Sequence, residues 1–381
     1  MRSFMLLLLL LSTQLYAQNL VTPTQRLQQT IQFEDDLDLE NMELALQRQL
    51  QAFRRRAPQG TIRFGSTNYP AAKLRESVEH FLVLVGETKQ CLSAAAREAC
   101  MSQLSKRLND EFLLFVPTPA QNEPGFGQEK TTLYTAYFSP DLVGARTPSE
   151  RFKNPIYAMP PREDLRTKRR EEIYFDNALA GQGLELFWVE DSLFDIYILH
   201  VEGGGRVRVQ NPDGSESKAY LSYAGTNGQR FEFISKYMIA QGMLPANRAS
   251  IENQARYIEE NPQHARDIFA SSPSYVYFKE TQTEPLGVRN IPLTENRSLA
   301  IDTRIYTEVG MITFVQTERP FRNERGAVEF RPFSRFFVSQ DTGGAIRGNA
   351  RCDLYMGYGD EAALAAHNIK RMGRQIFLVK K

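Results

Sequence analysis

The sequence predicts an α+β protein that is rich in β-structure in its centre and C-terminal part. Apolar residues recur at helical spacing in the N-terminal third, whereas short alternating runs broken by Gly and Pro dominate from Thr131 onward. No series of alternating βαβ units is visible. With 381 residues, 42% hydrophobic and 24% charged, the chain can form two or three domains, and its composition excludes wholesale disorder and collagen-like rods.

The N-terminal segment predicts export. Arg2 precedes an unbroken apolar run from Phe4 to Leu11, and Ala17 offers a signal peptidase site before Gln18. The run is shorter than the roughly twenty apolar residues of a membrane span. We expect residues 1–17 to be a cleaved signal peptide, with an uncleaved anchor as the alternative. No cysteine ends the run, so we expect a periplasmic protein without an outer-membrane lipid anchor.

Helices are predicted over Thr22–Arg56 and in two stretches within Leu74–Leu114. Cys91 and Cys100 flank the alanine-rich segment Ser93–Ala99, which favours helix. Nine residues of unbroken helix would separate their Cα atoms by about 13.5 Å, well beyond the roughly 7 Å limit for a disulfide. A bridge requires the helix to begin near Ser93 with Cys91 folding back, and the sequence leaves both states open. A third cysteine, Cys352, is expected to be a small core residue.

Strands and helices follow one another in the remaining chain. Alternating runs predict strands over Tyr134–Phe138, Leu184–Val189, Ile196–Val201 and Arg206–Val209, with breaks at Gly203–Gly205 and Asp213-Gly214. Helical spacing returns over Gln229–Gly242 and Ala249–Ala270, and Asn261-Pro262 interrupts the second stretch. The last strand candidates are Ser298–Asp302, Met311–Val315 and Phe336–Ser339, followed by a helix over Glu361–His367.

Charge and histidine spacing exclude several classes of function. The chain has 46 Lys plus Arg against 45 Asp plus Glu, so no overall basic field would attract nucleic acid, and no nucleic-acid partner is expected. His80, His200, His264 and His367 are scattered, without a pair at metal-ligand spacing. The Gly203-Gly-Gly-Arg206 segment lacks the ending of a phosphate-binding loop. We therefore expect no metal and no cofactor.

Three aspartates mark the candidate site. Asp302 and Asp341 end predicted strands and Asp353 lies just beyond the second of them, while Gly343 and Gly344 let the backbone approach a ligand closely. The alternative is that these acids cap turns and pair with neighbouring arginines. Asp341-Thr-Gly343 also matches the short aspartic-peptidase signature, but only one copy occurs, so a carboxylate dyad would require a dimer.

Several ordered motifs between residues 130 and 381 carry a resemblance. They are Thr135-Ala-Tyr-Phe-Ser-Pro140, Pro155-Ile-Tyr157, Gly181-Gln-Gly-Leu-Glu-Leu186, Tyr223-Ala-Gly-Thr-Asn-Gly228, Pro273-Ser-Tyr-Val-Tyr-Phe278 and Arg297-Ser-Leu-Ala-Ile-Asp302, with the motifs of the two later aspartates. In these motifs and their order the chain resembles the MltA family of membrane-bound lytic murein transglycosylases, including its C-terminal three-aspartate 3D domain.

The resemblance implies a discontinuous double-psi β-barrel domain. Residues 18–144, with the N-terminal helices, and residues 281–381 would form the barrel, while residues 145–280 would form a smaller inserted β domain. A groove for the glycan strand would run where the two meet. The implied partner is the peptidoglycan glycan strand. Cell-wall synthesis proteins are further candidate partners, and we expect a monomer.

The resemblance also implies the chemistry. The β-1,4 bond between N-acetylmuramic acid and N-acetylglucosamine would be cleaved, leaving 1,6-anhydromuramic ends. Asp353 maps onto the catalytic acid, which would act first as acid and then as base and needs a raised pKa, and Asp341 and Asp302 map onto positioning groups. Asp195, at the start of the run that contains the predicted strand Ile196–Val201, maps onto a recurrent acid with a structural or substrate-binding role.

Residues of several kinds are candidates for binding the sugar chain. Tyr137, Tyr157 and Tyr223, together with Phe138 and Trp188, would stack on sugar rings or lie in the core. Arg206 and Arg347 would meet substrate carboxylates or form salt bridges. The remaining candidates are Glu202, Asn227, Gly343 and Gly344.

Two departures from the family pattern leave alternatives open. The usual Val-Gln-Gly-Ser-Gly appears as Val201-Glu-Gly-Gly-Gly205, and Ala-Gly-Lys-Asn-Gly appears as Ala224-Gly-Thr-Asn-Gly228. The first alternative is a catalytically weak or inactive peptidoglycan-binding protein of the same fold. The second is a hydrolase with Asp341 as a second carboxylate.

Overall fold

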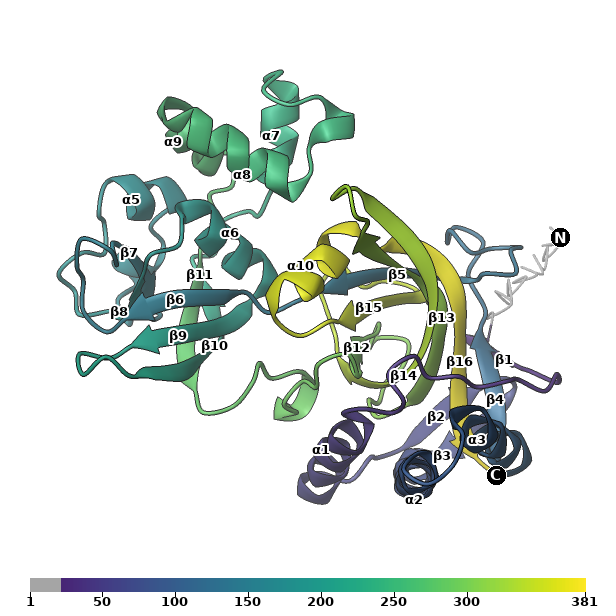
Figure 1. The fold of residues 1–381 in the computed structure, drawn as a ribbon. Helices are drawn as coiled ribbons and strands as arrows, with labels where there is room; N and C mark the ends of the chain where they lie inside the picture. The colour runs from purple at the N-terminus through teal and green to yellow at the C-terminus, as the bar shows by residue number, and fades with distance from the viewer. Residues whose placement is uncertain (1–21) are drawn as a thin grey trace, which may run out of the picture.

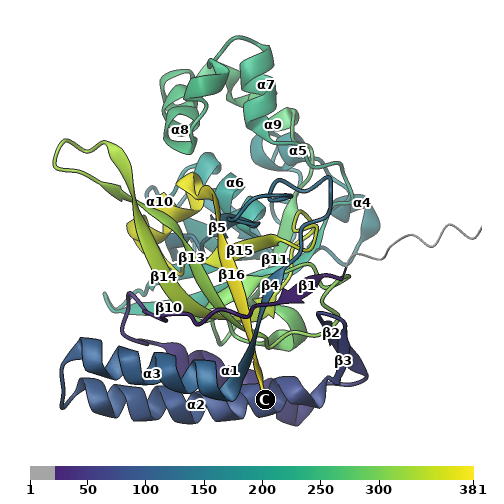
Figure 2. The same ribbon diagram turned by 90° about the vertical axis from the view of Figure 1, so that its right-hand side faces the viewer.

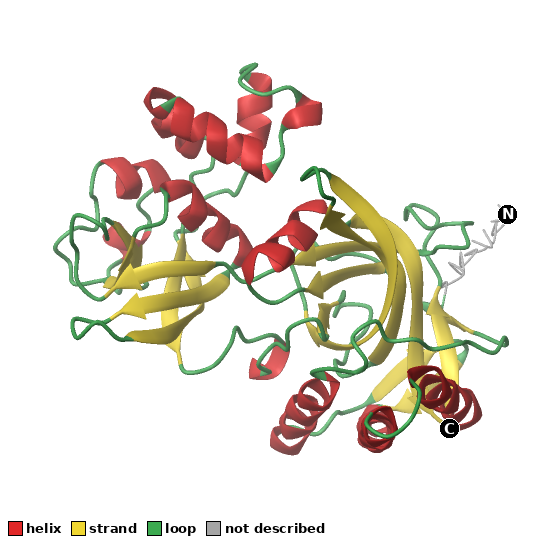
Figure 3. Cartoon of the chain, viewed as in Figure 1, coloured by secondary structure: helices red, strands yellow, loops and turns green. Residues whose placement is uncertain are grey.

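The computed structural model describes residues 22–381, so the predicted signal peptide lies outside the described residues. A β-barrel and a smaller β-sheet stand side by side, and helices lie below the barrel and above the small sheet (Figures 1 and 3). Within residues 22–381, no helix is both long and apolar enough to cross a bilayer.

Six strands close the barrel. Their order is β5 (Thr132–Tyr137), β16 (Lys370–Lys380), β13 (Ile312–Arg322), β14 (Val328–Asp341), β12 (Ser298–Ala300) and β15 (Arg351–Tyr355), which pairs back with β5. The β12–β14 and β15–β5 pairs are parallel and the others antiparallel. β4 (Phe112–Pro117) and β1 (Thr24–Arg26) continue the sheet from β16. The predicted fold class, an α+β protein with a double-psi β-barrel domain and an inserted smaller β domain, is confirmed.

The N-terminal helices α1 (Met42–Arg55), α2 (Ala72–Leu92) and α3 (Arg97–Glu111) pack beneath the barrel, beside the hairpin of β2 (Thr61–Phe64) and β3 (Thr67–Pro70) (Figure 2). The predicted helix over 22–56 is too long. Its first residues pair with β4 as strand β1, and Asp38, Leu39 and Asn41 have positive φ angles, which interrupt a right-handed helix.

The Cys91–Cys100 disulfide is formed, with the two Cα atoms 5.7 Å apart. Helix α2 runs through Cys91 and ends at Leu92, residues 93–96 turn, and α3 begins at Arg97. The bridge is possible because the chain turns within the alanine-rich segment, which the sequence had favoured as helix. Cys352 is buried in β15, as predicted.

A buried ion pair ties the N-terminal part to the barrel. Arg297 donates to both carboxylate oxygens of Asp35, at 2.6 and 2.9 Å, and both side chains are fully buried. Asp35 also accepts hydrogen bonds from the backbone amides of Phe336 and Leu39. Residues 262 positions apart are thereby joined in one domain.

The inserted domain contains a second sheet with the order β11-β10-β9-β6-β8-β7. Its strands are β6 (Asp141–Ala145), β7 (Asn154–Tyr157), β8 (Glu185–Val189), β9 (Gly204–Gln210), β10 (Glu216–Thr226) and β11 (Val276–Thr281). The helices of this region are α4 (Glu163–Arg166), α5 (Arg170–Phe175), α6 (Leu193–Glu202), α7 (Ile234–Ala240), α8 (Ile251–Glu260) and α9 (Ala265–Ala270). Short 3-10 turns lie at Ala246–Arg248, Pro262–His264 and Val288–Asn290, and α10 (Gly359–Asn368) follows β15.

Helix α6 corrects the predicted strand over Ile196–Val201. Its apolar residues face two cores, so the run lacks the helical alternation of a half-exposed helix. The ends carry clear helix signals: Ser192 and Asp195 form a capping box, and Gly203 ends the helix in the left-handed conformation. Gly203–Gly205 is therefore a helix end leading into β9, not a turn between strands.

The other predicted helices need smaller corrections. The stretch Gln229–Gly242 contains only the helix Ile234–Ala240, and the preceding residues are irregular. The predicted interruption at Asn261-Pro262 is confirmed, because α8 ends at Glu260 and a 3-10 turn precedes α9. Helix α10 confirms the prediction over Glu361–His367.

Candidate active site

The strand register places two of the three predicted aspartates in one row across the barrel. Ala300 in β12 pairs with Asp341 in β14 on one side and with Asp353 in β15 on the other. Asp353 in turn pairs with Thr135 in β5. Two strand spacings separate the backbones of the two aspartates, about 9.5 Å. The small Ala300 side chain between them leaves room above the row.

Asp353 is held by a relay of hydrogen bonds. The Thr135 hydroxyl donates to Asp353 Oδ1 at 2.5 Å, and the Arg351 guanidinium donates to the same hydroxyl oxygen at 2.7 Å. Burial raises the pKa of Asp353 above its ordinary value, while the Thr135 hydrogen bond and the Arg351 charge lower it by less. The group therefore holds a proton to a higher pH than a free aspartate.

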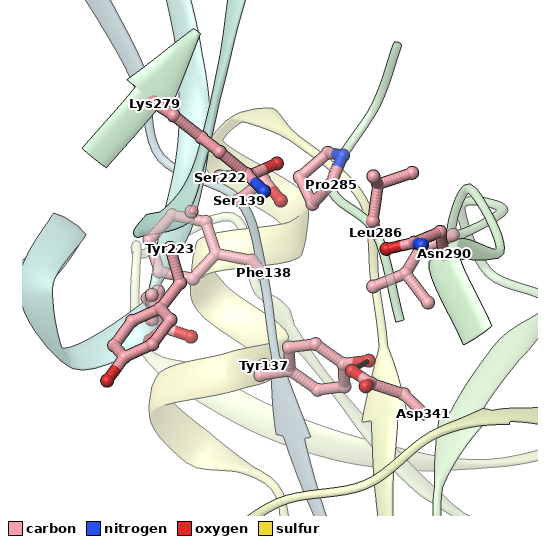
Figure 4. A pocket seen from close by; sticks show the side chains of 14 residues that line it. Tyr137, Phe138, Ser139, Ser222, Tyr223, Lys279, Pro285, Leu286, Asn290 and Asp341 are labelled. Carbon is pink, nitrogen blue, oxygen red and sulfur yellow. Dashed lines mark hydrogen bonds between the residues drawn. The ribbon is translucent and has the colours of Figure 1, made fainter. Parts of the chain in front are cut away.

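Asp341, at the end of β14, is held by Tyr137 of β5, three strands away around the barrel. The Tyr137 hydroxyl donates to Asp341 Oδ2 at 2.7 Å (Figure 4), and the backbone amide of Thr342 donates to Oδ1 at 2.8 Å. Tyr137 lies two residues beyond Thr135 on the same strand, so both side chains point to the same face. Burial raises the pKa of Asp341 to about 6, although these hydrogen bonds oppose the shift.

A cleft between the barrel and the inserted domain contains these acids. Its larger part encloses about 650 Å³ and is lined by Asp341 and Asp353 from the barrel and by Phe231 and Phe233 from the inserted domain. A smaller part of about 230 Å³ is lined by Tyr223, Lys279 and Ser139, among others (Figure 4). The two parts share three lining residues, which are Tyr137, Glu202 and Asp341.

Glu202 faces the aspartates from the inserted domain. It is the last residue of α6 and carries a third acid into the cleft. Burial raises the pKa of Glu202 to about 8, and the negative charge of Asp353 adds to the shift. Three carboxyl groups with raised pKa values therefore lie along one cleft.

Asp302 has a different environment from the other two aspartates. Its carboxylate accepts hydrogen bonds from Arg304, at 2.8 and 2.6 Å, and from the backbone amide of Gly348 at 2.9 Å. The Arg304 hydrogen bonds lower its pKa to about 2, despite opposing burial. Asp302 does not line either part of the cleft. It fixes the end of the loop 342–348 that does line it.

The other predicted binding residues divide into two groups. Tyr137, Tyr223, Glu202, Gly343 and Gly344 line the cleft. Tyr157, Asn227, Asp195, Arg206 and Arg347 do not line either part of it.

Three residues of the second group have evident structural environments. Tyr157 is buried in a small core cluster. The Asn227 amide donates to the carbonyls of Lys168 and Pro273. Asp195 is exposed in the first turn of α6, and its carboxylate accepts hydrogen bonds from the backbone amide and the hydroxyl of the N-cap residue Ser192.

The two predicted arginines are also engaged elsewhere. Arg206 forms a bidentate ion pair with Asp141, at 2.8 and 2.6 Å, and lies over the Tyr358 ring. The guanidinium of Arg347 donates to the carbonyl groups of Gly343 and Ile346.

Sequence reasoning missed several residues of the site. Thr135, which holds Asp353, lies in the Thr135–Pro140 motif, and its position two residues before Tyr137 was the available signal. Lys279 and the exposed Phe231–Phe233 pair, with ring centroids 4.9 Å apart, lie in segments without a chemical motif. Among residues 22–381, no cluster of three or more His, Cys, Asp or Glu side chains could hold a metal ion.

The barrel, the inserted sheet and the acid-lined cleft define a two-domain β-barrel protein with a binding cleft between its domains. The MltA specific insert domain matches residues 133–279, and the 3D domain matches residues 297–379. The chain belongs to the MltA family of lytic murein transglycosylases.

Known relatives extend this result. Membrane-bound lytic murein transglycosylase A of Vibrio cholerae is 34% identical over 252 residues, 66% of each chain. The Escherichia coli protein of the same name is 31% identical over 243 residues, 63% of this chain and 64% of that one. The chain thus matches slightly less than two thirds of the length of these relatives. The structure of E. coli MltA with bound chitohexaose shares the fold, with a TM-score of 0.67, 24% identity, and coverage of 94% of this chain and 95% of that one.

Proposed function

We propose that the chain is an exported lytic transglycosylase. It cleaves the β-1,4 bond between N-acetylmuramic acid and N-acetylglucosamine in peptidoglycan and leaves 1,6-anhydromuramic ends. The observation that carries this proposal is Asp353, a carboxyl group of raised pKa in a cleft between two domains, held by Thr135 and Arg351. The names of the curated relatives support the same activity and an exported location.

The proposed reaction uses one carboxyl group twice. Protonated Asp353 donates its proton to the glycosidic oxygen as the bond from C1 to that oxygen breaks. The C6 hydroxyl of the muramic residue then attacks C1, and its proton passes to the Asp353 carboxylate as the anhydro ring closes. No water is consumed, and Asp353 ends the cycle protonated. A raised pKa suits the first step because the acid must hold a proton near its working pH.

The neighbouring groups position the substrate in this proposal. Asp341, fixed by Tyr137, lies on the opposite side of Ala300 from Asp353 and faces the same sugar residues. Asp302 does not contact the substrate itself but anchors the loop that carries Gly343 and Gly344. Lys279, in the smaller part of the cleft, takes the role of meeting lactyl or peptide carboxylates that the sequence had suggested for Arg206 and Arg347.

Digestion of purified sacculi tests the proposal. The wild-type protein should release muropeptides that end in 1,6-anhydromuramic acid, detected by mass spectrometry, and Asp353→Asn should reduce their yield by at least about a hundredfold. Asp213→Asn in the exposed turn of the β9–β10 hairpin is the matched control and should cleave like the wild type. Reducing ends in place of anhydro ends would instead mean hydrolysis. Intact glycan with retained binding would mean an inactive binding protein.

A further inference from the structure

Glu202 occupies the junction of the cleft. Tyr137, Glu202 and Asp341 are the three residues that line both of its parts, and Glu202 is the one that comes from the inserted domain. A polymer that extends from the larger part into the smaller one therefore passes Glu202, which lies on the inserted-domain side of the cleft where the two parts meet.

The surroundings of Glu202 favour its neutral form. Asp341, Asp353 and Tyr137 face it from the barrel, while His200 and Lys279 lie in its own domain and line the larger and smaller part of the cleft, respectively. Of the charged groups in residues 22–381, the one that perturbs its pKa is Asp353, an acid. Glu202 also ends α6, where the helix dipole disfavours a negative charge.

We propose that Glu202 is a substrate-binding residue that donates a hydrogen bond from its neutral carboxyl group to a glycan oxygen at the junction of the cleft. This rests on the proposed function, because the ligand is a β-1,4-linked chain of N-acetylated sugars. A neutral carboxyl group offers one O–H donor, which suits the carbonyl of an acetamido group or a sugar hydroxyl, whereas a carboxylate can only accept.

The protonation state gives this contact a distinct pH dependence. The pKa of Glu202 is raised to about 8, so the donor is present below that pH and is lost above it. Above that pH, the ionised Glu202 also places a negative charge beside Asp341 and Asp353. Both effects weaken ligand binding in the same direction as pH rises.

Chitohexaose binding to the Asp353→Asn protein tests the inference without turnover. Calorimetric titrations on both sides of pH 8 should show affinity falling by at least about tenfold as the pH rises through the pKa of Glu202, because the donor is lost and an anion is added. In Asp353→Asn the neighbouring anion is absent, so the midpoint should lie somewhat below that of the wild type, while burial, the main cause of the shift, remains. Adding Glu202→Gln should make the affinity independent of pH over this range, since the amide keeps a donor and does not titrate.

Two further variants complete the test. Glu202→Ala in the same background should bind about tenfold more weakly at low pH, because the donor is lost. Glu216→Gln, at the far end of the β9–β10 hairpin, is the matched acid-to-amide control and should keep the original pH curve. The inference is overturned if Glu202→Gln leaves the pH curve unchanged or if Glu202→Ala binds like its parent. Failure of the proposed function would be seen in a separate assay, in which sacculi digested with the wild-type protein would yield no 1,6-anhydromuramic ends.

Discussion

The hydroxyl of Thr135 should set the pH range in which Asp353 works as an acid. It donates to the Asp353 carboxylate at 2.5 Å and so stabilises the ionised form. Thr135→Val removes this donor and keeps nearly the same volume. The ionised form then becomes less favourable, and the already raised pKa of Asp353 should rise further.

The magnitude follows from the energy of one hydrogen bond to a charged group. Such a bond contributes about 1.5–3 kcal/mol. One pKa unit corresponds to about 1.36 kcal/mol, so the pKa of Asp353 should rise by about one to two units. The lower end is the better expectation, because water in the cleft can replace part of the interaction.

The pH profile of kcat/KM for release of anhydromuropeptides measures this shift. Activity should fall with rising pH as Asp353 loses its proton, and Thr135→Val should move that alkaline limb upward by about one pH unit. Arg351→Met should move it in the same direction, since the Arg351 charge also lowers the pKa. Thr132→Val, a buried change in the same strand that contacts Gln375, should leave the limb in place. An alkaline limb that stays fixed or moves downward in Thr135→Val would refute the reasoning.

Three further predictions concern stability and substrate charge. Asp35→Asn leaves Arg297 as an unpaired buried cation and should lower the free energy of unfolding by about 3–5 kcal/mol in urea titrations, where a loss below about 1 kcal/mol would contradict the buried pair. Burial raises the pKa of Asp35, but Arg297 more than offsets this and the net pKa is lowered, so the stabilisation is present above the unfolded-state pKa and is lost as pH falls through the folded value. Replacing Cys91 and Cys100 by Ser should cost about 2–3 kcal/mol, the value for a short closed loop, and an unchanged denaturation midpoint would count against a stabilising bridge. Lys279→Met in the Asp353→Asn background should weaken binding of peptide-bearing glycan several-fold at low salt and leave chitohexaose binding nearly unchanged, whereas equal loss for both ligands would argue against a carboxylate contact.

Much of the strand content was predictable from local pattern, but the burial of α6 concealed its structure. Alternation in Tyr134–Phe138 predicts a strand, and the structure has β5 over Thr132–Tyr137, where alternate residues pack in the barrel core. Helix α6 packs against two cores, so nearly every position is apolar and periodicity carries no information. Its true signals were Ser192 and Asp195 at its N-terminal end and Gly203 directly after its C-terminal end.

Residue type alone could not tell which cations were free to meet a ligand. Arg206 and Lys279 look alike in a linear reading, since each lies in a strand of the inserted domain. Their difference arises from Asp141, which is 65 positions from Arg206 and is brought beside it by the parallel pairing of β6 with β9. Such a pairing depends on strand register, which local sequence does not encode.

Local sequence likewise does not show which groups set the pKa of the catalytic acid. Asp353 could be selected from its motif, but its partner Thr135 is 218 positions away and meets it through the parallel β15–β5 pairing. Glu202 reaches the cleft from another domain, at the end of a helix that the sequence pattern does not reveal. The proton affinity of the site is therefore a property of the assembled cleft, in which burial between two domains raises the pKa of Asp341, Asp353 and Glu202 together. A variant that opens the cleft should lower all three pKa values at once, whereas a change at Thr135 acts directly on Asp353 alone.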